Sequence, residues 1–140
     1  MFRIEFLPGD ARDAGYLWRN GRIAVAEGDE PFRALIHDWH EDDYERQWRE
    51  ALASLARGDR YACLVTVMPP VGAREMAELW PLLREGDDVR MRNVWIPPQN
   101  VDRDRPWAGV SEQDFDDYGS AEWRFSVDDL ARFLQQLEQE

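Results

Sequence analysis

Residues 42–70 read DDYERQWREALASLARGDRYACLVTVMPP and contain two elements of different period. In the first element, apolar residues recur at the i, i+4, i+7, i+8 and i+11 spacing of one helix face. Acidic residues begin it, where the helix dipole favours negative charge, and Gly58 is a residue type that commonly ends a helix. The spacing predicts a helix from Asp42 to Arg57, with Tyr44, Trp48, Ala51, Leu52 and Leu55 packed into the core.

The second element, residues 61–68, is apolar at almost every position and is followed by two prolines. Since successive side chains of a strand point to opposite faces, such a run is typical of a central strand that is covered on both sides. The single cysteine, Cys63, lies in this run, where a thiol behaves as a small hydrophobe. We therefore expect Cys63 to be structural, and one cysteine excludes an intrachain disulfide.

Upstream of the helix, short alternating segments predict an antiparallel meander. Phe2, Ile4 and Phe6 alternate with polar residues, as in a half-buried strand. Residues 23–26 and 32–36 are two further strand candidates. We expect turns between them at Pro8-Gly9-Asp10, Asn20-Gly21 and Gly28-Asp29.

Downstream, residues 76–83 and 89–96 predict a hairpin around Glu85-Gly86-Asp87. Pro81 cannot donate a ladder hydrogen bond, so the first arm should be an edge there or contain a bulge. A helix over residues 73–83 also fits the spacing of the apolar residues. The alternation places Val89, Met91 and Trp95 on one face of the return strand, and we expect Trp80 and Trp95 to pack in the core.

Residues 97–120 have almost no periodicity and predict a long loop. Trp123 and Phe125 then alternate as in a last short strand. Ser126 and Asp129 resemble a capping box, and they precede a second amphipathic pattern that predicts a C-terminal helix. The order of these elements predicts the α+β class: one domain over residues 1–140, with a mostly antiparallel sheet of about five to seven strands, one inserted helix and one C-terminal helix.

Composition narrows the range of functions. The chain has 140 residues and a formal net charge of −12, which disfavours binding to nucleic acid or to an anionic membrane. The first residues contain neither a basic start nor a long apolar run, and no segment is as long and apolar as a membrane span. We therefore expect a cytoplasmic protein. Seven tryptophans in so short a chain must lie in a core or on a binding face.

A cluster of His37 and His40 with neighbouring carboxylates raises the possibility of a divalent metal site. However, the two histidines are three residues apart, and they straddle a predicted strand end and helix start. A solvated acidic turn fits the same residues, since carboxylates are favoured near a helix N-terminus. We therefore expect no metal and no cofactor here, and a small metal-dependent enzyme centred on these histidines is kept as an alternative.

Two acidic segments are candidates for binding a basic partner. Aromatic side chains inside an acidic rim provide buried area, while the charges steer the encounter. A solvated, self-repelling loop is the simpler explanation of such charge runs. The first candidate surface is the acidic turn Asp38, Glu41, Asp42, Asp43 and Glu45. The second is the loop surface Trp107, Asp114, Phe115, Asp116, Asp117 and Tyr118.

Residues 38–96 resemble the immunity proteins of contact-dependent growth inhibition systems. The resemblance rests on Asp43-Tyr44, Gln47-Trp48, Ala51-Leu52, Leu55 and Gly58, on the run from Ala62 to Thr66, and on Trp80-Pro81-Leu82, Arg84-Glu85-Gly86-Asp87 and Asn93. It implies a non-enzymatic cytoplasmic inhibitor that binds the toxic C-terminal domain of one cognate effector. Many such toxins are nucleases with basic surfaces, and an acidic protein is complementary to them. An acidic interaction subunit of another assembly is a further alternative.

Overall fold

The computed structural model describes residues 1–116 and 121–139, which contain eight strands and two α-helices. This composition confirms the α+β class. The helix predicted from Asp42 and the C-terminal helix are both present. The elements are β1 (Phe2–Asp13), β2 (Tyr16–Val25), β3 (Gly28–Ile36), α1 (Glu41–Ala56), β4 (Tyr61–Val67), β5 (Ala77–Glu85), β6 (Asp88–Met91), β7 (Val94–Ile96), β8 (Trp123–Ser126) and α2 (Val127–Glu138), with short 3₁₀ helices η1 (Pro98–Asn100), η2 (Pro106–Gly109) and η3 (Glu112–Phe115).

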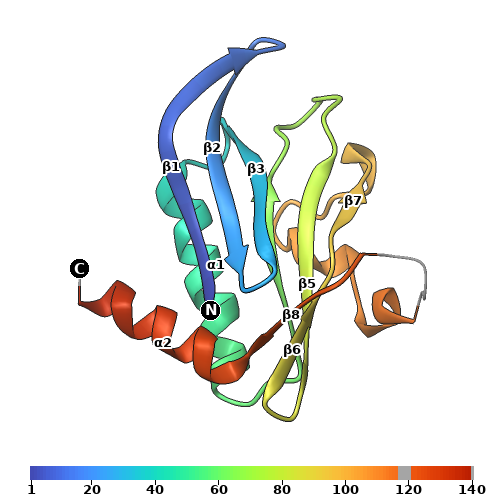
Figure 1. Ribbon diagram of the computed structural model, residues 1–140. Coiled ribbons are helices and arrows are strands. Elements are labelled where there is room, and N and C mark those ends of the chain that lie inside the picture. The colour runs from blue at the N-terminus through green and yellow to red at the C-terminus, as the bar shows by residue number, and fades with distance from the viewer. Residues whose placement is uncertain (117–120, 140) are drawn as a thin grey trace.

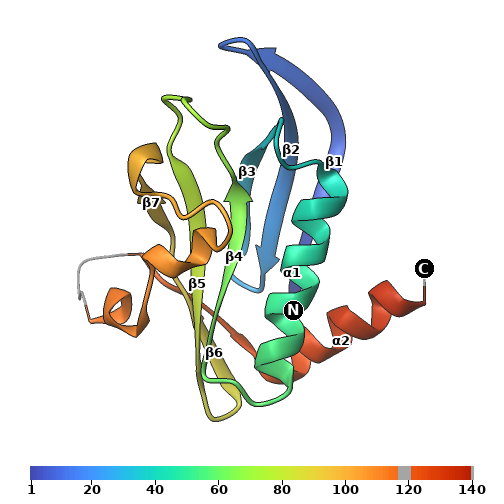
Figure 2. The same ribbon diagram turned by 180° about the vertical axis from the view of Figure 1, so that it is seen from behind.

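The strands form two antiparallel sheets rather than the one expected sheet (Figure 1). The first sheet has the order β1-β2-β3. The second has the order β4-β5-β6-β8, and β7 pairs with the part of β5 that β6 does not reach. Seen from behind, α1 crosses in front of the first sheet and lies beside β4 (Figure 2). One hydrophobic core takes side chains from both sheets and both helices.

The free edge of β4 is covered by polar side chains of α1 instead of by another strand. Gln47 donates from Nε2 to the carbonyl of Cys63 over 2.7 Å, and its Oε1 accepts from the Val65 N–H over 2.9 Å. The indole N–H of Trp48 donates to the Val65 carbonyl over 2.7 Å. Because these backbone groups are buried, leaving them without partners would cost free energy. The helix therefore replaces a neighbouring strand.

Tyr44 connects the two sheets through a buried hydroxyl. This hydroxyl donates to the carbonyl of Leu35 in β3 over 2.7 Å and accepts from the N–H of Met68 over 2.9 Å. The phenol is fully buried, and burial raises its pKa above the ordinary value. We call Tyr44, Gln47 and Trp48, with the backbone groups that they bond, the α1–β4 seam.

Two predicted turns in the N-terminal meander are wrong. The sequence at Pro8-Gly9-Asp10 forms a register shift within one long β1, and Gly21 lies inside β2 opposite Phe6 and Phe32. A Cβ atom on Gly21 would lie 2.3 Å from Cζ of Phe32 and 2.9 Å from the carbonyl oxygen of Glu5. Glycine is required here because of this close approach and not because of a turn. The actual turn is at Ala14 and Gly15, both with positive φ.

Residues 77–85 form strand β5, so the alternative helix over 73–83 is wrong. Pro81 pairs with Cys63 on one side, and on the other side the partner strand is interrupted between β6 and β7. This interruption confirms the irregularity predicted from Pro81. It also breaks the alternation of the return strand, because Val89 and Met91 are buried whereas Trp95 is half exposed. The prediction that Trp95 packs in the core is therefore wrong. Trp80 is buried as expected and contacts the ring of Trp123.

The last strand and helix confirm the capping pattern in the sequence. Ser126 Oγ accepts from the Asp129 N–H over 3.0 Å, and a carboxylate oxygen of Asp129 lies 3.5 Å from the Ser126 N–H. The apolar face of α2 carries the buried side chains of Leu130 and Phe133. Phe133 packs edge-on against Phe2 of β1, so the C-terminal helix covers the end of the first sheet.

Candidate partner-binding surfaces

The acidic turn lies where β3 leads into α1, and part of its charge serves the helix. Asp43 accepts from the His40 N–H over 2.9 Å, and its other oxygen accepts from Arg46 over 2.6 Å. The hydrogen bond from His40, with the charge of Arg46, lowers the pKa of Asp43 below its ordinary value. Asp43 therefore works first as a helix-capping group.

The other carboxylates of the turn differ in their surroundings. Glu41 pairs with Arg19 of β2, and Asp38 accepts from Nδ1 of His37 over 2.8 Å. Burial raises the pKa of Glu45, and the nearby charges of Asp42 and Glu41 act in the same direction. Asp42 is exposed. The turn is thus a real acidic surface, but three of its five members are already engaged within the protein.

The two histidines have different neighbours. His37 lies edge-on to the ring of Tyr16, whereas His40 stands at the N-cap of α1. Among residues 1–116 and 121–139, no group of three or more His, Cys, Asp or Glu residues is placed to hold a metal ion.

Cys63 is buried, and desolvation raises the pKa of its thiol. No helix in the described part of the chain is both long and apolar enough to cross a membrane.

In the loop surface, Phe115 is buried rather than exposed. Two guanidinium groups cover its ring, with Cζ of Arg90 5.3 Å and Cζ of Arg92 5.6 Å from the ring centroid. Its carbonyl lies 3.4 Å from Nη2 of both arginines. These contacts fix the loop onto the second sheet. Asp114 accepts from the Ser111 N–H at the start of η3, and Asp116 is exposed.

Glu122 is the ionic centre of this region. Its carboxylate lies 2.8 Å from Arg90, 3.3 Å from Arg92 and 3.2 Å from Arg124. Burial alone would raise the pKa of Glu122, but the three arginines outweigh it and lower the pKa. Trp107 packs against the core and is half buried. Asp117 and Tyr118, the remaining members of the loop surface, lie outside the described residues.

The structure also contains a cleft that the sequence did not indicate. It opens between the first sheet and the β5–β7 side of the second sheet and has a volume of about 880 Å³. We call it the sheet cleft. One wall comes from β2 and β3, and the other from the connection before β5 and from β7. Its main lining residues are Asp13, Trp18, Gly21, Phe32, Arg33, Glu75, Met76, Glu78 and Trp95.

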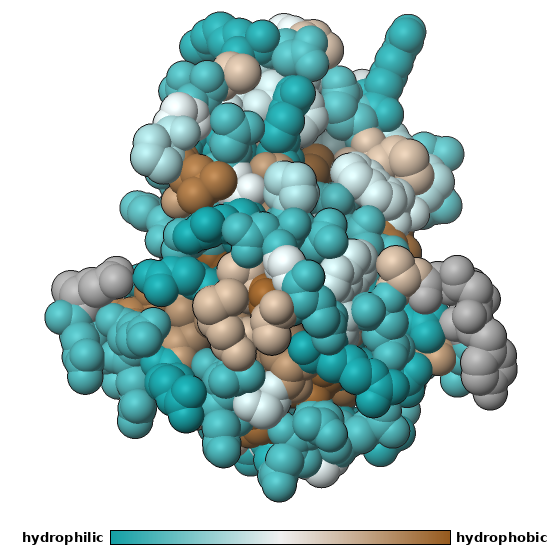
Figure 3. Space-filling model, in the orientation of Figure 1, coloured by the Kyte–Doolittle hydropathy of each residue, from teal (hydrophilic) through white to brown (hydrophobic). Residues whose placement is uncertain are grey.

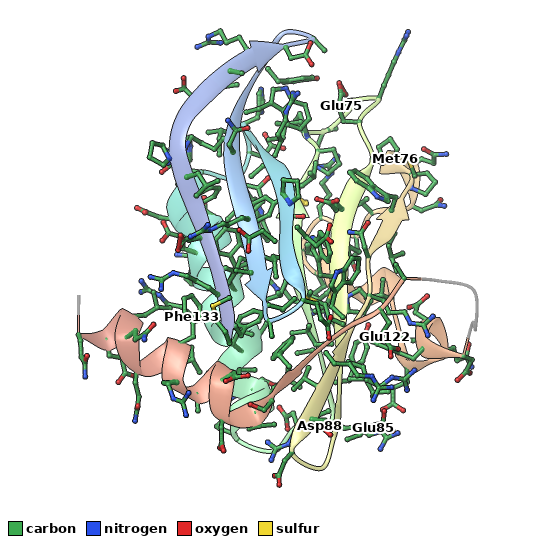
Figure 4. The ribbon with its side chains drawn as sticks, in the orientation of Figure 1. Glu75, Met76, Glu85, Asp88, Glu122 and Phe133 are labelled. Carbon is green, nitrogen blue, oxygen red and sulfur yellow. The ribbon has the colours of Figure 1, made fainter. Side chains whose placement is uncertain are left out.

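The sheet cleft and the Glu122 region lie in different parts of the molecule. Glu75 and Met76 lie in the upper part of Figure 4, Glu122 lies in the lower half, and Glu85 and Asp88 lie at the lower end. In the space-filling view from the same side, hydrophobic atoms interrupt the mostly hydrophilic surface (Figure 3). The sequence did not indicate the cleft, because its alternation places Trp95 on the buried face of the return strand, whereas the interruption between β6 and β7 leaves Trp95 half exposed.

Comparison with known proteins finds a solved structure of the same fold and a matching protein family. A chain of the solved structure described as the CdiA-CT/CdiI toxin and immunity complex from Enterobacter cloacae has the same fold, with a TM-score of 0.83, 18% sequence identity and coverage of 100% of both chains. The family model of the CdiI N-terminal domain matches residues 34–133, so the chain belongs to this family. No curated protein matches the chain significantly. The resemblance noted in the sequence is thereby confirmed.

Proposed function

We propose that the chain is an immunity protein of a contact-dependent growth inhibition system. It binds the toxic C-terminal domain of one cognate CdiA-type effector and neutralises it by covering its active or substrate-binding surface. The family match over residues 34–133 carries this proposal. The solved protein of the same fold comes from a complex of a toxin and its immunity protein, which supports it.

The proposed inhibition is stoichiometric occlusion in the cytoplasm, and no bond is made or broken. The formal charge of −12 suits a basic surface such as that of a nuclease. In this proposal the exposed charges of the acidic turn and of the loop surface steer the encounter. Asp42 and Asp116 fit that role best because both are exposed, whereas the exposed Asp38 is already paired with His37. We further propose that residues 1–140 act as one domain, since both sheets contribute to one core.

Titration of the cognate toxin domain tests the proposal. An occluding inhibitor removes toxin activity linearly and reaches zero at one equivalent, whereas an enzyme that modifies the toxin would act at far lower ratios. In cells, the chain should restore growth against its own toxin domain and not against an unrelated one. Absence of a complex and of protection would overturn the proposal, as would complete inactivation at a small fraction of one equivalent.

Charge reversal tests the steering surfaces. Asp42→Arg and Asp116→Arg are expected to slow association with the toxin domain several-fold at low salt and to reduce its dependence on salt. Glu50→Arg, at an exposed position of α1 outside both surfaces, is the matched control. Association rates equal to that of the unmodified chain for both variants would show that the two acidic surfaces do not steer binding.

A further inference from the structure

The exposed apolar side chains are concentrated at one end of the molecule. Among the described residues, four large apolar side chains are exposed, and three of them, Val71, Met76 and Trp95, lie on the β4–β5 connection and on β7. Met76 and Trp95 line the sheet cleft. Trp95 is 50% exposed although the chain buries most of its other large rings. A tryptophan left half in water beside a cleft is a residue type that dominates binding energies when a partner covers it.

Aromatic side chains form much of the walls of the sheet cleft. Trp18 and Phe32 form one side, and the close contact of Gly21 with Phe32 brings β2 and β3 together there. On the other side, Trp95 is paired directly across from Glu78 in the β5–β7 ladder. A volume of about 880 Å³ is enough to receive one or two side chains of a partner.

The charges in the cleft are unbalanced. Three carboxylates, Asp13, Glu75 and Glu78, line it. The guanidinium of Arg33, which also lines it, is already engaged: it lies 3.3 Å from Asp13 and stacks 4.7 Å from the ring of Trp18. The cleft therefore has an excess of negative charge.

Two of these carboxylates have no cation among their hydrogen-bond partners in the described residues. Oε2 of Glu75 is buried without a hydrogen-bond partner. Glu78 accepts from the hydroxyl of Thr66 over 2.6 Å and from the side-chain amide of Asn93 over 3.3 Å, both neutral groups. A buried carboxylate oxygen without a donor is a position that a partner's N–H group can fill.

These observations select the chemistry of the occupant. The apolar walls require an apolar side chain, and the unpaired carboxylate oxygen requires a donor, which is strongest when it is positively charged. A second copy of this chain, itself carrying −12, would be repelled. Resting on the proposed function, we infer that the sheet cleft receives a segment of the cognate toxin domain in which an apolar side chain stands next to an arginine or a lysine.

Binding of the full chain to the purified toxin domain tests this inference, with Kd measured by calorimetry. Trp95→Ser is expected to raise Kd at least 30-fold, as for a central anchor. Glu75→Gln, which keeps the shape but removes the charge, should raise Kd about tenfold. Met76→Arg, which places a cation of this chain in the cleft, should raise Kd at least tenfold. Glu50→Gln on the exposed side of α1 is the matched control and should change Kd less than twofold.

The three altered positions allow folding and binding to be separated. Thermal unfolding of each variant should match that of the unmodified chain, because Trp95 and Met76 are exposed; Trp95→Phe, which keeps an apolar ring, should recover part of the affinity. If the unmodified chain binds the toxin domain and the cleft variants bind equally well, the inference is wrong while the proposed function stands. If the unmodified chain does not bind, both fail. A dimer in sedimentation that Trp95→Ser disperses would also overturn the inference.

Discussion

The α1–β4 seam and the sheet cleft both lie between the two sheets, but their polar groups are satisfied to different extents. In the seam, the hydroxyl of Tyr44 and the amide of Gln47 each bond two backbone groups, and the side chains are almost fully buried. In the cleft, Trp95 is half exposed and Glu75 has an unpaired carboxylate oxygen. The seam therefore stabilises the fold, whereas the cleft has the exposed ring and the unpaired oxygen on which the proposed binding of the toxin domain rests.

Breaking the seam should have the largest effect. Gln47→Leu leaves the carbonyl of Cys63 and the N–H of Val65 unpaired in the interior. Each unsatisfied buried group costs about 1–3 kcal/mol, so we expect a loss of about 3 kcal/mol in the free energy of unfolding, measured by urea titration. Glu50→Leu, at an exposed position of the same helix, should change it by less than about 0.5 kcal/mol. Equal losses for both variants would mean that the hydrogen bonds from Gln47 to the edge of β4 do not determine the free energy of unfolding.

A larger side chain at Gly21, on the β2 wall of the cleft, should lower the free energy of unfolding. Gly21→Ala would place a Cβ atom 2.3 Å from Cζ of Phe32 and 2.9 Å from the Glu5 carbonyl oxygen. Such overpacking typically costs about 2 kcal/mol in unfolding free energy. Asn20→Ala, at the exposed neighbouring position, is the control and should cost much less. A Gly21→Ala variant as stable as the unmodified chain would show that this wall of the cleft is soft.

The carboxylate of Glu78 should cost stability in the isolated protein. Burial raises its pKa above the ordinary 4.5, only partly offset by hydrogen bonds from Thr66 and Asn93. Because the folded state then holds the proton more tightly, stability falls as the pH rises from about 4.5 through the raised pKa. Glu78→Gln should therefore raise the unfolding free energy at neutral pH by about 1 kcal/mol and flatten its pH dependence. Thermal melts between pH 4 and pH 8 measure this, and an unchanged profile would contradict it.

The smallest effect on stability is expected at Trp95. Its ring is half exposed, so Trp95→Ser should change the unfolding free energy by about 0.5 kcal/mol or less. The buried Trp48→Phe, which leaves the Val65 carbonyl unpaired, is the matched change in the seam and should cost about 1–2 kcal/mol. Comparable losses of unfolding free energy for the two variants would contradict the conclusion that the seam stabilises the fold more than the cleft does.

Local patterns predicted the elements that local interactions determine. The helix from Asp42 was predictable because the acidic first turn, the periodicity and the glycine after it agree, and Gly58 does have a positive φ of 112°. The C-terminal helix was predictable for the same reason, from Ser126 and Asp129. The α+β class was predictable from the order of the helices and strands along the chain.

Features that depend on contacts between distant segments were not predictable. Asn20-Gly21 has the sequence of a turn, yet Gly21 is selected by the ring of Phe32, eleven residues away. Where the two sheets separate, the side chains of Gln47 and Tyr44 bond backbone groups of Cys63, Leu35 and Met68, and such bonds leave no periodic signal in the sequence. The sheet cleft joins residues 7–33 to residues 67–95, so composition alone could not reveal it.

The covering of β4 by α1 also has a consequence for biosynthesis. The run Tyr61–Val67 is rich in strand-forming apolar residues, and its bare edge would pair readily with the same segment of another chain and seed aggregates. A ribosome makes α1 before β4, so the side chains that protect this edge leave the exit tunnel ahead of the strand that needs them.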